Sequence, residues 1–216
     1  MEQQLQYLTH LEKSKKKPKG RIFVTSGLGG MSGAQPKAGN ISECITVCAE
    51  VNRKAIETRH SQNWVDEIIN NTPELVERLK TAQENNEVVS IAYHGNIVDV
   101  WESLYENNVM VDIGSDQTSL HNPWSGGYYP VGYSFEEANK LIYENPIKFK
   151  SEVKSTLKRH VEIINKHVNR GTYFFDYGNA FLLEASKADA DIVKEDGSFK
   201  YPSYVQDIMG PMCFDY

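Results

Sequence analysis

The sequence has few cysteines, no long apolar run and fewer basic than acidic residues. Its three cysteines show no zinc-site spacing, and Cys44 and Cys48, which we expect on one face of a strand, are not placed to form a disulfide. No run approaches the roughly 20 apolar residues of a membrane span, and the polar start lacks the apolar segment of a signal peptide. The net charge of −6 argues against a nucleic-acid partner. We therefore expect a cytoplasmic protein with no membrane, nucleic-acid or metal partner.

What is present is the composition of an ordinary globular protein, with 40% hydrophobic and 24% charged residues over 216 positions. Strand-like and helix-like runs alternate, with strands expected near 21–25, 43–49, 88–93, 109–113 and 172–176. This alternation predicts an α/β fold with a doubly wound, mainly parallel, Rossmann-like sheet and helices on both faces. We expect an N-terminal helix and linker over 1–20, the Rossmann-like domain over 21–200 and a C-terminal segment over 201–216.

The most informative stretch, RIFVTSGLGGMSGAQP at 21–36, is a strand that breaks into a glycine-dense turn before a helix. Glycines leave the backbone open to a ligand, and N–H groups at the start of a helix suit a phosphate. Glu50 ends the next strand 20 residues after Gly30, near the distance at which a carboxylate binds the ribose of a dinucleotide. The strict G-x-G-x-x-G fingerprint is broken, because Ser32 stands where its third glycine would be.

Other polar motifs follow the remaining predicted strands, where open α/β sheets bind ligands. They are His94–Asn96, Ser115–His121 and Tyr177–Asn179. The loop SDQTSLHNPWSGGYYPVGY is long and rich in hydroxyl, amide and aromatic groups, which suits contacts with a cofactor. Two residues of these motifs leave alternatives open: Asn96 is either a helix cap or a ligand donor, and His121 is either a general acid or base or a packing residue.

Taken together, GLGGMSGAQP, the position of Glu50, HGN, DQTSLHNP with GGYYP behind it, and FDYGN resemble the urocanase (urocanate hydratase) family in order and spacing. The resemblance covers nearly all of 20–216 and points to the NAD-binding domain inserted in that family. The family is a hydro-lyase of histidine degradation. It converts urocanate and water to 4-imidazolone-5-propanoate, using tightly bound NAD⁺ as an electrophile.

The resemblance implies a set of NAD-binding residues: Gly30, Met31, Ser32, Glu50, Asn96, Ile97, Gln117, Thr118, Ser119, Leu120, His121, Tyr128, Tyr129 and Tyr177. It also places Cys213 near a cysteine that bacterial members hold beside the cofactor, although the spacing is two residues longer. Two departures stand out. Ser32 replaces a glycine, and Ala55 lies where some relatives carry an arginine five residues after the acidic residue.

The same resemblance implies that flanking domains complete the NAD and urocanate pockets. The chain would then be the cofactor half of an enzyme, inactive alone and homodimeric at full length. Two other readings fit the glycine turn and Glu50. One is an NAD-dependent oxidoreductase, and Glu50 would favour NAD over NADP because a carboxylate repels a 2′-phosphate. The other is a non-catalytic nucleotide-sensing domain.

Overall fold

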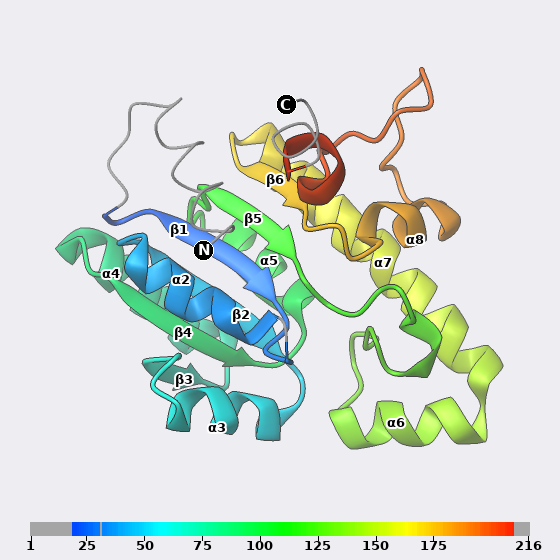
Figure 1. Cartoon of the computed structure of the whole chain (residues 1–216), viewed down its shortest axis with the longest axis horizontal. Coiled ribbons are helices and arrows are strands. Elements are labelled where there is room, and N and C mark those ends of the chain that lie inside the picture. Colours follow the sequence, from blue (N-terminus) through cyan, green and yellow to red (C-terminus); the bar gives the residue numbers. More distant parts are fainter. Residues whose placement is uncertain (1–18, 31, 210–216) are drawn as a thin grey trace.

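The computed structural model describes residues 19–30 and 32–209, which form a parallel sheet between two layers of helices (Figure 1). The strands are β1 (Ile22–Ser26), β2 (Ile45–Glu50), β3 (Glu67–Ile69), β4 (Val89–His94), β5 (Ile113–Asp116) and β6 (Tyr173–Asp176). The α-helices are α2 (Gln35–Ile41), α3 (Arg53–Ser61), α4 (Thr72–Asn85), α5 (Ile97–Glu106), α6 (Phe135–Glu144), α7 (Pro146–Asn169) and α8 (Phe181–Lys187). Short helical segments are η1 (Ser32–Ala34), η2 (Pro123–Ser125) and η3 (Tyr204–Met209). None of the helices in this described part is long and apolar enough to cross a membrane.

The strand order across the described sheet is β3-β4-β2-β1-β5-β6, and every pair is parallel. Without the short edge strand β3, the other strands run third, second, first, fourth and fifth, which is the order of the doubly wound dinucleotide-binding fold. The predicted fold class is confirmed. The chain crosses from β4 to β5 on the other side of β1, so the switch point lies between β1 and β5. Ligands bind at the carboxyl ends of the strands at such a point.

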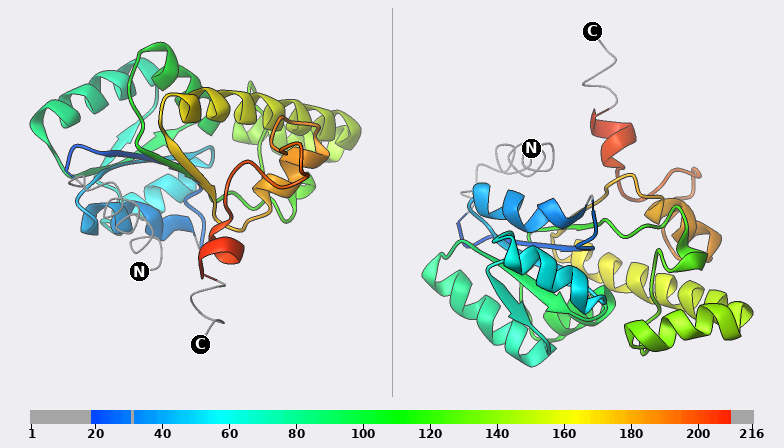
Figure 2. Two further views of the ribbon diagram at one scale, coloured as in Figure 1. Left: turned by 90° about the horizontal axis from the view of Figure 1, so that it is seen from above. Right: turned by 60° about the horizontal axis from the view of Figure 1, so that its bottom comes forward.

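The two faces of the sheet bury different cores because alternate residues of a strand point to opposite sides. Ile22 and Val24 of β1 are fully buried in the main cluster, which also contains residues of α4, α5 and α7. Phe23 joins a smaller cluster on the other face with Phe175 of β6. Seen from above in Figure 2, α4 and α7 lie on one side of the sheet and α2 lies on the other. The helices therefore cover both faces, as expected.

The structure corrects two details of the predicted sheet. The edge strand β3 was not anticipated, because a strand of three residues, of which only Ile69 is buried, is too short to show a period. The fourth expected strand, 109–113, begins later, at Ile113, where pairing with Phe23 of β1 starts. Val109 and Val111 are buried although they precede the strand. Their apolar side chains therefore indicate a place in the core and not strand pairing.

Helix ends agree well with the local signals in the sequence. Ser134 caps α6 and forms a reciprocal capping box with Glu137, while Pro146 begins α7, which ends at Asn169 just before Gly171. At the start of α4, which begins at Thr72, the side chain of Asn71 accepts the capping hydrogen bond from Glu74 N. The expected N-terminal amphipathic helix lies outside the described residues.

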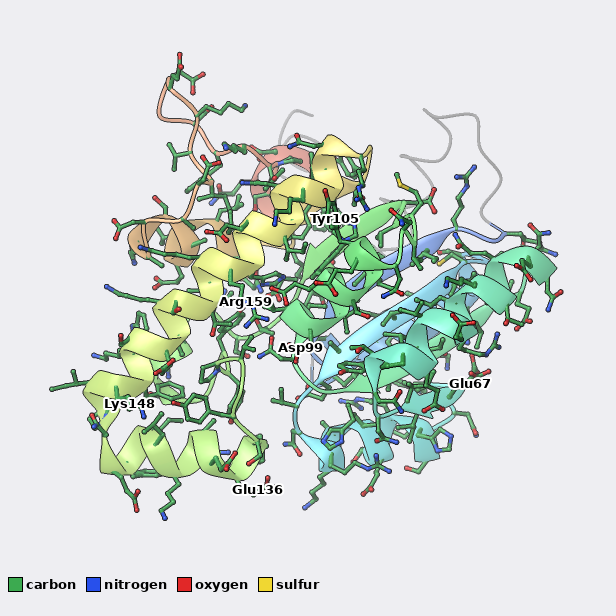
Figure 3. The ribbon with its side chains drawn as sticks, turned by 180° about the vertical axis from the view of Figure 1, so that it is seen from behind. Glu67, Asp99, Tyr105, Glu136, Lys148 and Arg159 are labelled. Atoms are coloured by element: carbon green, nitrogen blue, oxygen red, sulfur yellow. The ribbon has the colours of Figure 1, made fainter. Side chains whose placement is uncertain are left out.

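The long helix α7 packs against α5 on the rear of the molecule. Figure 3 shows Arg159 of α7 beside Asp99 of α5. The Arg159 guanidinium binds both carboxylate oxygens of Glu102 at 2.5 Å. Further along, the Arg170 guanidinium carbon lies 3.3 Å from the centroid of the Tyr105 ring. These contacts fix α7, which in turn supports the long loop that follows β5.

Candidate functional site

A cavity of about 260 Å³ opens at the carboxyl ends of β1, β2, β4 and β5. Four segments of the chain that are distant in sequence meet there: the glycine turn, the end of β2, the start of α5 and the loop after β5. Nine of the residues predicted to bind a cofactor line it: Ser32, Glu50, Asn96, Ile97, Gln117, Thr118, Ser119, Tyr128 and Tyr129. The motifs after β1, β2, β4 and β5 therefore share one cleft, whereas the motif after β6, Tyr177–Asn179, does not line it.

The glycine turn owes its path to Gly27 and to the buried side chain of Gln35. Gly27 has φ +90°, and a Cβ there would lie 3.0 Å from both Gln117 O and Ser32 Oγ. The Gln35 amide nitrogen donates to the carbonyl oxygens of Ser26 and Gly27 at 3.2 Å. The turn is thus held from below by the first residue of α2, a contact that sequence reasoning missed although Gln35 belongs to the recognised motif.

The other glycines of the turn have different roles. A Cβ on Gly30 would meet nothing within 4 Å, so this exposed residue leaves space at the surface of the turn. Gly33 instead makes room for the protein itself, because its Cβ would lie 2.1 Å from Arg59 Nε. Ser32 is buried and accepts a hydrogen bond at 3.0 Å from Gly29 N. Its hydroxyl hydrogen remains available to a ligand.

Glu50, the last residue of β2, faces the cavity while its carboxylate braces the backbone. Oε2 accepts from Leu28 N at 2.8 Å and Oε1 accepts from Asn52 N at 2.9 Å. Each carboxylate oxygen has a further acceptor position. Glu50 can therefore hold the glycine turn and still accept hydrogen bonds from ribose hydroxyls.

Asn96 joins the end of β4 to the long loop. Its Oδ1 caps α5 by accepting from Val98 N at 3.0 Å, and its Nδ2 donates to Tyr129 O at 2.9 Å. The cap, one of the two alternatives considered for this residue, is therefore present. Because the amide nitrogen is bound to the loop, Asn96 shapes the cavity wall through the backbone of Tyr129.

The loop after β5 forms the wall opposite the glycine turn. Gly127 permits its tight fold, since a Cβ there would lie 2.1 Å from Ser119 O and 2.5 Å from Asn122 O. The side-chain nitrogen of Gln117 is buried and has no hydrogen-bond partner in the described part of the protein. A buried donor without a partner is costly, so this group suits a ligand acceptor in the cavity.

The loop is anchored to α7 by two polar contacts, one buried and one partly buried. Tyr128 Oη lies 3.0 Å from His160 Nδ1, and Val131 N donates to Thr156 Oγ1 at 3.0 Å. Burial holds the pKa of His160 well below its ordinary value, at about 4, and raises that of Tyr128. Both groups are therefore neutral at pH 7, and the contact is an uncharged hydrogen bond that fixes the Tyr128 ring in the cavity wall.

Beneath the cavity, Asp116 links three strand ends. Its Oδ1 accepts from Thr118 N, Thr118 Oγ1 and Asn179 Nδ2 at 3.0, 2.6 and 2.9 Å, and its Oδ2 accepts from Ser26 Oγ. The carboxylate is fully buried. Sequence reasoning placed these motifs at one edge but did not find their common acceptor, because nothing local distinguishes this aspartate from a loop residue.

Four predicted residues do not line the cavity, and two lie outside the described part of the chain. Gly30 is exposed on the turn, Leu120 is fully buried and His121 is exposed on the loop. The Tyr177 ring stacks on Tyr204 with 5.6 Å between centroids. Met31 and Cys213 fall among residues that the structure does not describe. Among those it does describe, no cluster of three or more His, Cys, Asp or Glu side chains could hold a metal ion.

Replacing Asp176 by asparagine is expected to stabilise the protein at pH 7. Asp176 is 4% exposed and lies beside Asp116 in the β5–β6 ladder; burial, with the Asp116 charge, raises its pKa from 3.8 to about 6. A raised pKa favours the fold fully below pH 4, and this contribution is lost as the pH rises through 6. Asparagine resembles the protonated acid, so the Asp176→Asn gain in unfolding free energy should reach up to about 3 kcal/mol at pH 7.

Urea unfolding at pH 7 and pH 4 measures this effect, and the gain should disappear at the lower pH. Asp196→Asn is the matched control, because hydrogen bonds from Ser198 lower the pKa of that exposed carboxyl and no gain is expected. An Asp176→Asn variant no more stable than the wild type at pH 7 would contradict the assignment.

The fold and the cavity define a Rossmann-like α/β domain with a cavity at its strand ends. Comparison with known proteins identifies the family. The family model described as "Urocanase Rossmann-like domain" matches residues 5–208, so the chain belongs to the urocanase family.

Curated relatives agree with this assignment. The chain is 56% identical over 195 residues to a probable urocanate hydratase of Dictyostelium discoideum, and 51% identical over 199 residues to the urocanate hydratase of Homo sapiens. Each match covers 88% of this chain and 29% of the relative, so the chain spans under a third of their length. Among solved structures, one titled as a D-mannonate oxidoreductase of Haemophilus influenza with bound NAD aligns with a TM-score of 0.36 and 10% identity, covering 73% of this chain and 54% of the other.

Proposed function

We propose that this chain is the NAD-binding part of a urocanate hydratase, a hydro-lyase that adds water to urocanate. The observation that carries the proposal is the shared cavity, where the glycine turn, Glu50 and Gln117 meet at the switch point of the sheet. The family assignment supplies the reaction. The relatives are more than three times as long, so the substrate pocket and the rest of the cofactor pocket belong to segments beyond this domain.

The residues around the cavity fit a dinucleotide. The diphosphate would lie over Gly30 and Ser32, where the backbone is open and a hydroxyl is available. Glu50 would accept hydrogen bonds from a ribose, and Gln117 would donate its unpartnered N–H to the cofactor. The remaining proposed contacts are with Met31, Asn96, Ile97, Thr118, Ser119, Leu120, His121, Tyr128, Tyr129 and Tyr177.

When bound, NAD⁺ would supply an electron-deficient ring that accepts electron density from the substrate's imidazole. The residues described here would bind and orient the cofactor and keep one side of its site dry. Cys213 is proposed to lie near it. We further propose that the flanking segments contribute to the urocanate site and that the complete enzyme forms a homodimer in the cytoplasm.

Calorimetric titration with NAD⁺ tests cofactor binding, using both this chain and the complete enzyme that contains it. Glu50→Gln should weaken NAD⁺ binding by about tenfold, the effect of one charge-assisted hydrogen bond, while weakening NADP⁺ binding less because the repulsive charge is gone. Glu57→Gln removes a charge of α3 that pairs only with Arg53 among the described residues, and should change neither affinity.

The proposal would be rejected if neither protein bound NAD⁺ at millimolar concentration. It would also be rejected if the complete enzyme failed to consume urocanate. A net gain of reduced nicotinamide, seen by its near-ultraviolet absorbance during turnover, would instead indicate an oxidoreductase.

A further inference from the structure

Arg59, in the last turn of α3, reaches back to the glycine turn across more than 25 residues of sequence. Its Nε donates to Leu28 O at 3.1 Å, and its Nη2 donates to Gly29 O at 2.5 Å. A third bond, from Nη1 to Gln62 Oε1 at 2.8 Å, holds the other edge of the guanidinium. The planar fork of arginine suits this arrangement, because one rigid group binds two consecutive carbonyl oxygens.

The surroundings of Arg59 hold it in this position. Its guanidinium carbon lies 5.1 Å from the centroid of the Trp64 ring, a cation–π contact. On the other side, the side chain packs so closely on Gly33 that any Cβ there would overlap it. Gly33 is one of the glycines that marked the turn as a ligand site, and its hydrogen atom faces a side chain of the same protein.

The opposite edge of the turn is held by an acidic group. Glu50 takes the N–H of Leu28, whereas Arg59 takes the carbonyl oxygens of Leu28 and Gly29. Gly29 and Ser32 line the cavity, but Arg59 does not. The carbonyl groups of Leu28 and Gly29 therefore point to the Arg59 guanidinium, which lies outside the cavity. Their partial negative charges are kept away from a cofactor phosphate.

The residue of α3 that lines the cavity is Ala55, which carries no charge. Arg59 lies four residues later, one turn along the same face of α3. We propose that Arg59 is a positioning residue for the glycine turn, holding the Leu28 and Gly29 carbonyls away from the cavity so that the turn is electropositive toward a diphosphate.

The inference rests on the proposed binding of NAD, and its test separates the two. Titrations with NAD⁺ and with adenosine, which lacks a diphosphate, are compared for the wild type and Arg59→Met. Loss of charged hydrogen bonds should weaken NAD⁺ binding by about tenfold while leaving adenosine binding within about twofold. Arg53→Met is the matched control, because Arg53 lies on the same helix but binds Glu57 and Asn70. It should change neither affinity.

A second variant displaces Arg59 without removing its charge. Gly33→Ala should weaken NAD⁺ binding as Arg59→Met does, since the new methyl group overlaps the guanidinium. Added to Arg59→Met, it should have little further effect, because the group that it displaces is gone. Additive losses in the double variant would mean that the methyl group blocks the cofactor directly, and would overturn the inference.

A third measurement requires no ligand. The backbone amide signals of Gly29 and Gly33 should shift in Arg59→Met and remain unchanged in Arg53→Met. If the wild type binds neither NAD⁺ nor adenosine, the proposed function fails and these signals still decide the role of Arg59. If Arg59→Met had the same amide signals and the same NAD⁺ affinity as Arg53→Met, the proposed positioning role of Arg59 would be refuted.

Discussion

Replacing Trp101 with alanine should lower the free energy of unfolding by about 3–5 kcal/mol, the range for truncating a large buried aromatic side chain. Trp101 is fully buried in α5, edge-on to the His167 ring at 4.8 Å and to the Phe174 ring at 6.4 Å. It therefore joins α5, α7 and β6. Its removal leaves a cavity in the layer that supports the loop after β5.

Urea unfolding followed by circular dichroism measures the loss, and Trp101→Phe is the graded control. The indole nitrogen of Trp101 is buried and has no hydrogen-bond partner in the described part of the structure, so phenylalanine removes no side-chain hydrogen bond. We expect it to cost about 1–2 kcal/mol, from lost volume alone. An alanine variant no less stable than the phenylalanine variant would contradict the packing argument.

Gly114 of β5 provides an independent check of this contact. A Cβ at Gly114 would lie 2.5 Å from Trp101 Cη2, so Gly114→Ala should destabilise the wild type by overpacking. In the Trp101→Ala background the same methyl group would partly fill the cavity. The two substitutions should therefore be less harmful together than the sum of their separate effects, a coupling expected only for residues in contact.

The residues that the sequence places at the cavity are those whose positions are fixed by local spacing. The glycine turn joins β1 to α2 directly, and Glu50 ends the neighbouring strand, so both positions follow from the β-α-β unit. Asn96 follows β4 in the same way. Because parallel strands bring their carboxyl ends to one edge, these residues needed no long-range information to be placed together.

The parts that were missed depend on contacts between distant segments. Thr156 and His160 lie one turn apart on α7, and their pattern is that of any buried helix face. Their partners, Val131 and Tyr128, lie 25 and 32 residues earlier in an irregular loop. The role of Arg59 is hidden for the same reason. No spacing rule connects a helix residue to the carbonyl groups that it binds elsewhere.

The β5 prediction was displaced because hydrophobicity and pairing do not coincide in this strand. Its residues, IGSD, include a glycine that faces Trp101 and the aspartate beneath the cavity. Asp112, just before the strand, binds Arg21 and Ile22 N at the other end of β1. The polar groups at the two ends of this short strand contribute to the fold and to the cavity. Because they are polar, the strand cannot be found from a run of apolar residues.

Asp116→Ala should destabilise the protein by about 3–5 kcal/mol, because at least two buried donors lose their acceptor at about 1–3 kcal/mol each. Asn179 Nδ2 and Ser26 Oγ are the most affected, since both residues are buried. The loss also releases Thr118, which lines the cavity, from the end of β5. Stability and NAD⁺ affinity should therefore fall together.

Two variants distinguish the role of Asp116 as a hydrogen-bond acceptor from a general effect of removing a negative charge. Asp116→Asn keeps one carbonyl oxygen for Thr118 and Asn179 and should lose less than half as much stability. Asp112→Ala removes an aspartate at the opposite edge of the sheet, so it should lower stability without changing NAD⁺ affinity below the unfolding transition. Urea unfolding and calorimetry measure both quantities. If Asp116→Ala had the same NAD⁺ affinity as Asp112→Ala, the hydrogen bonds of Asp116 would support only the fold. If stability and NAD⁺ affinity fall together, Asp116 is the residue through which the strand ends hold the loop after β5 in place.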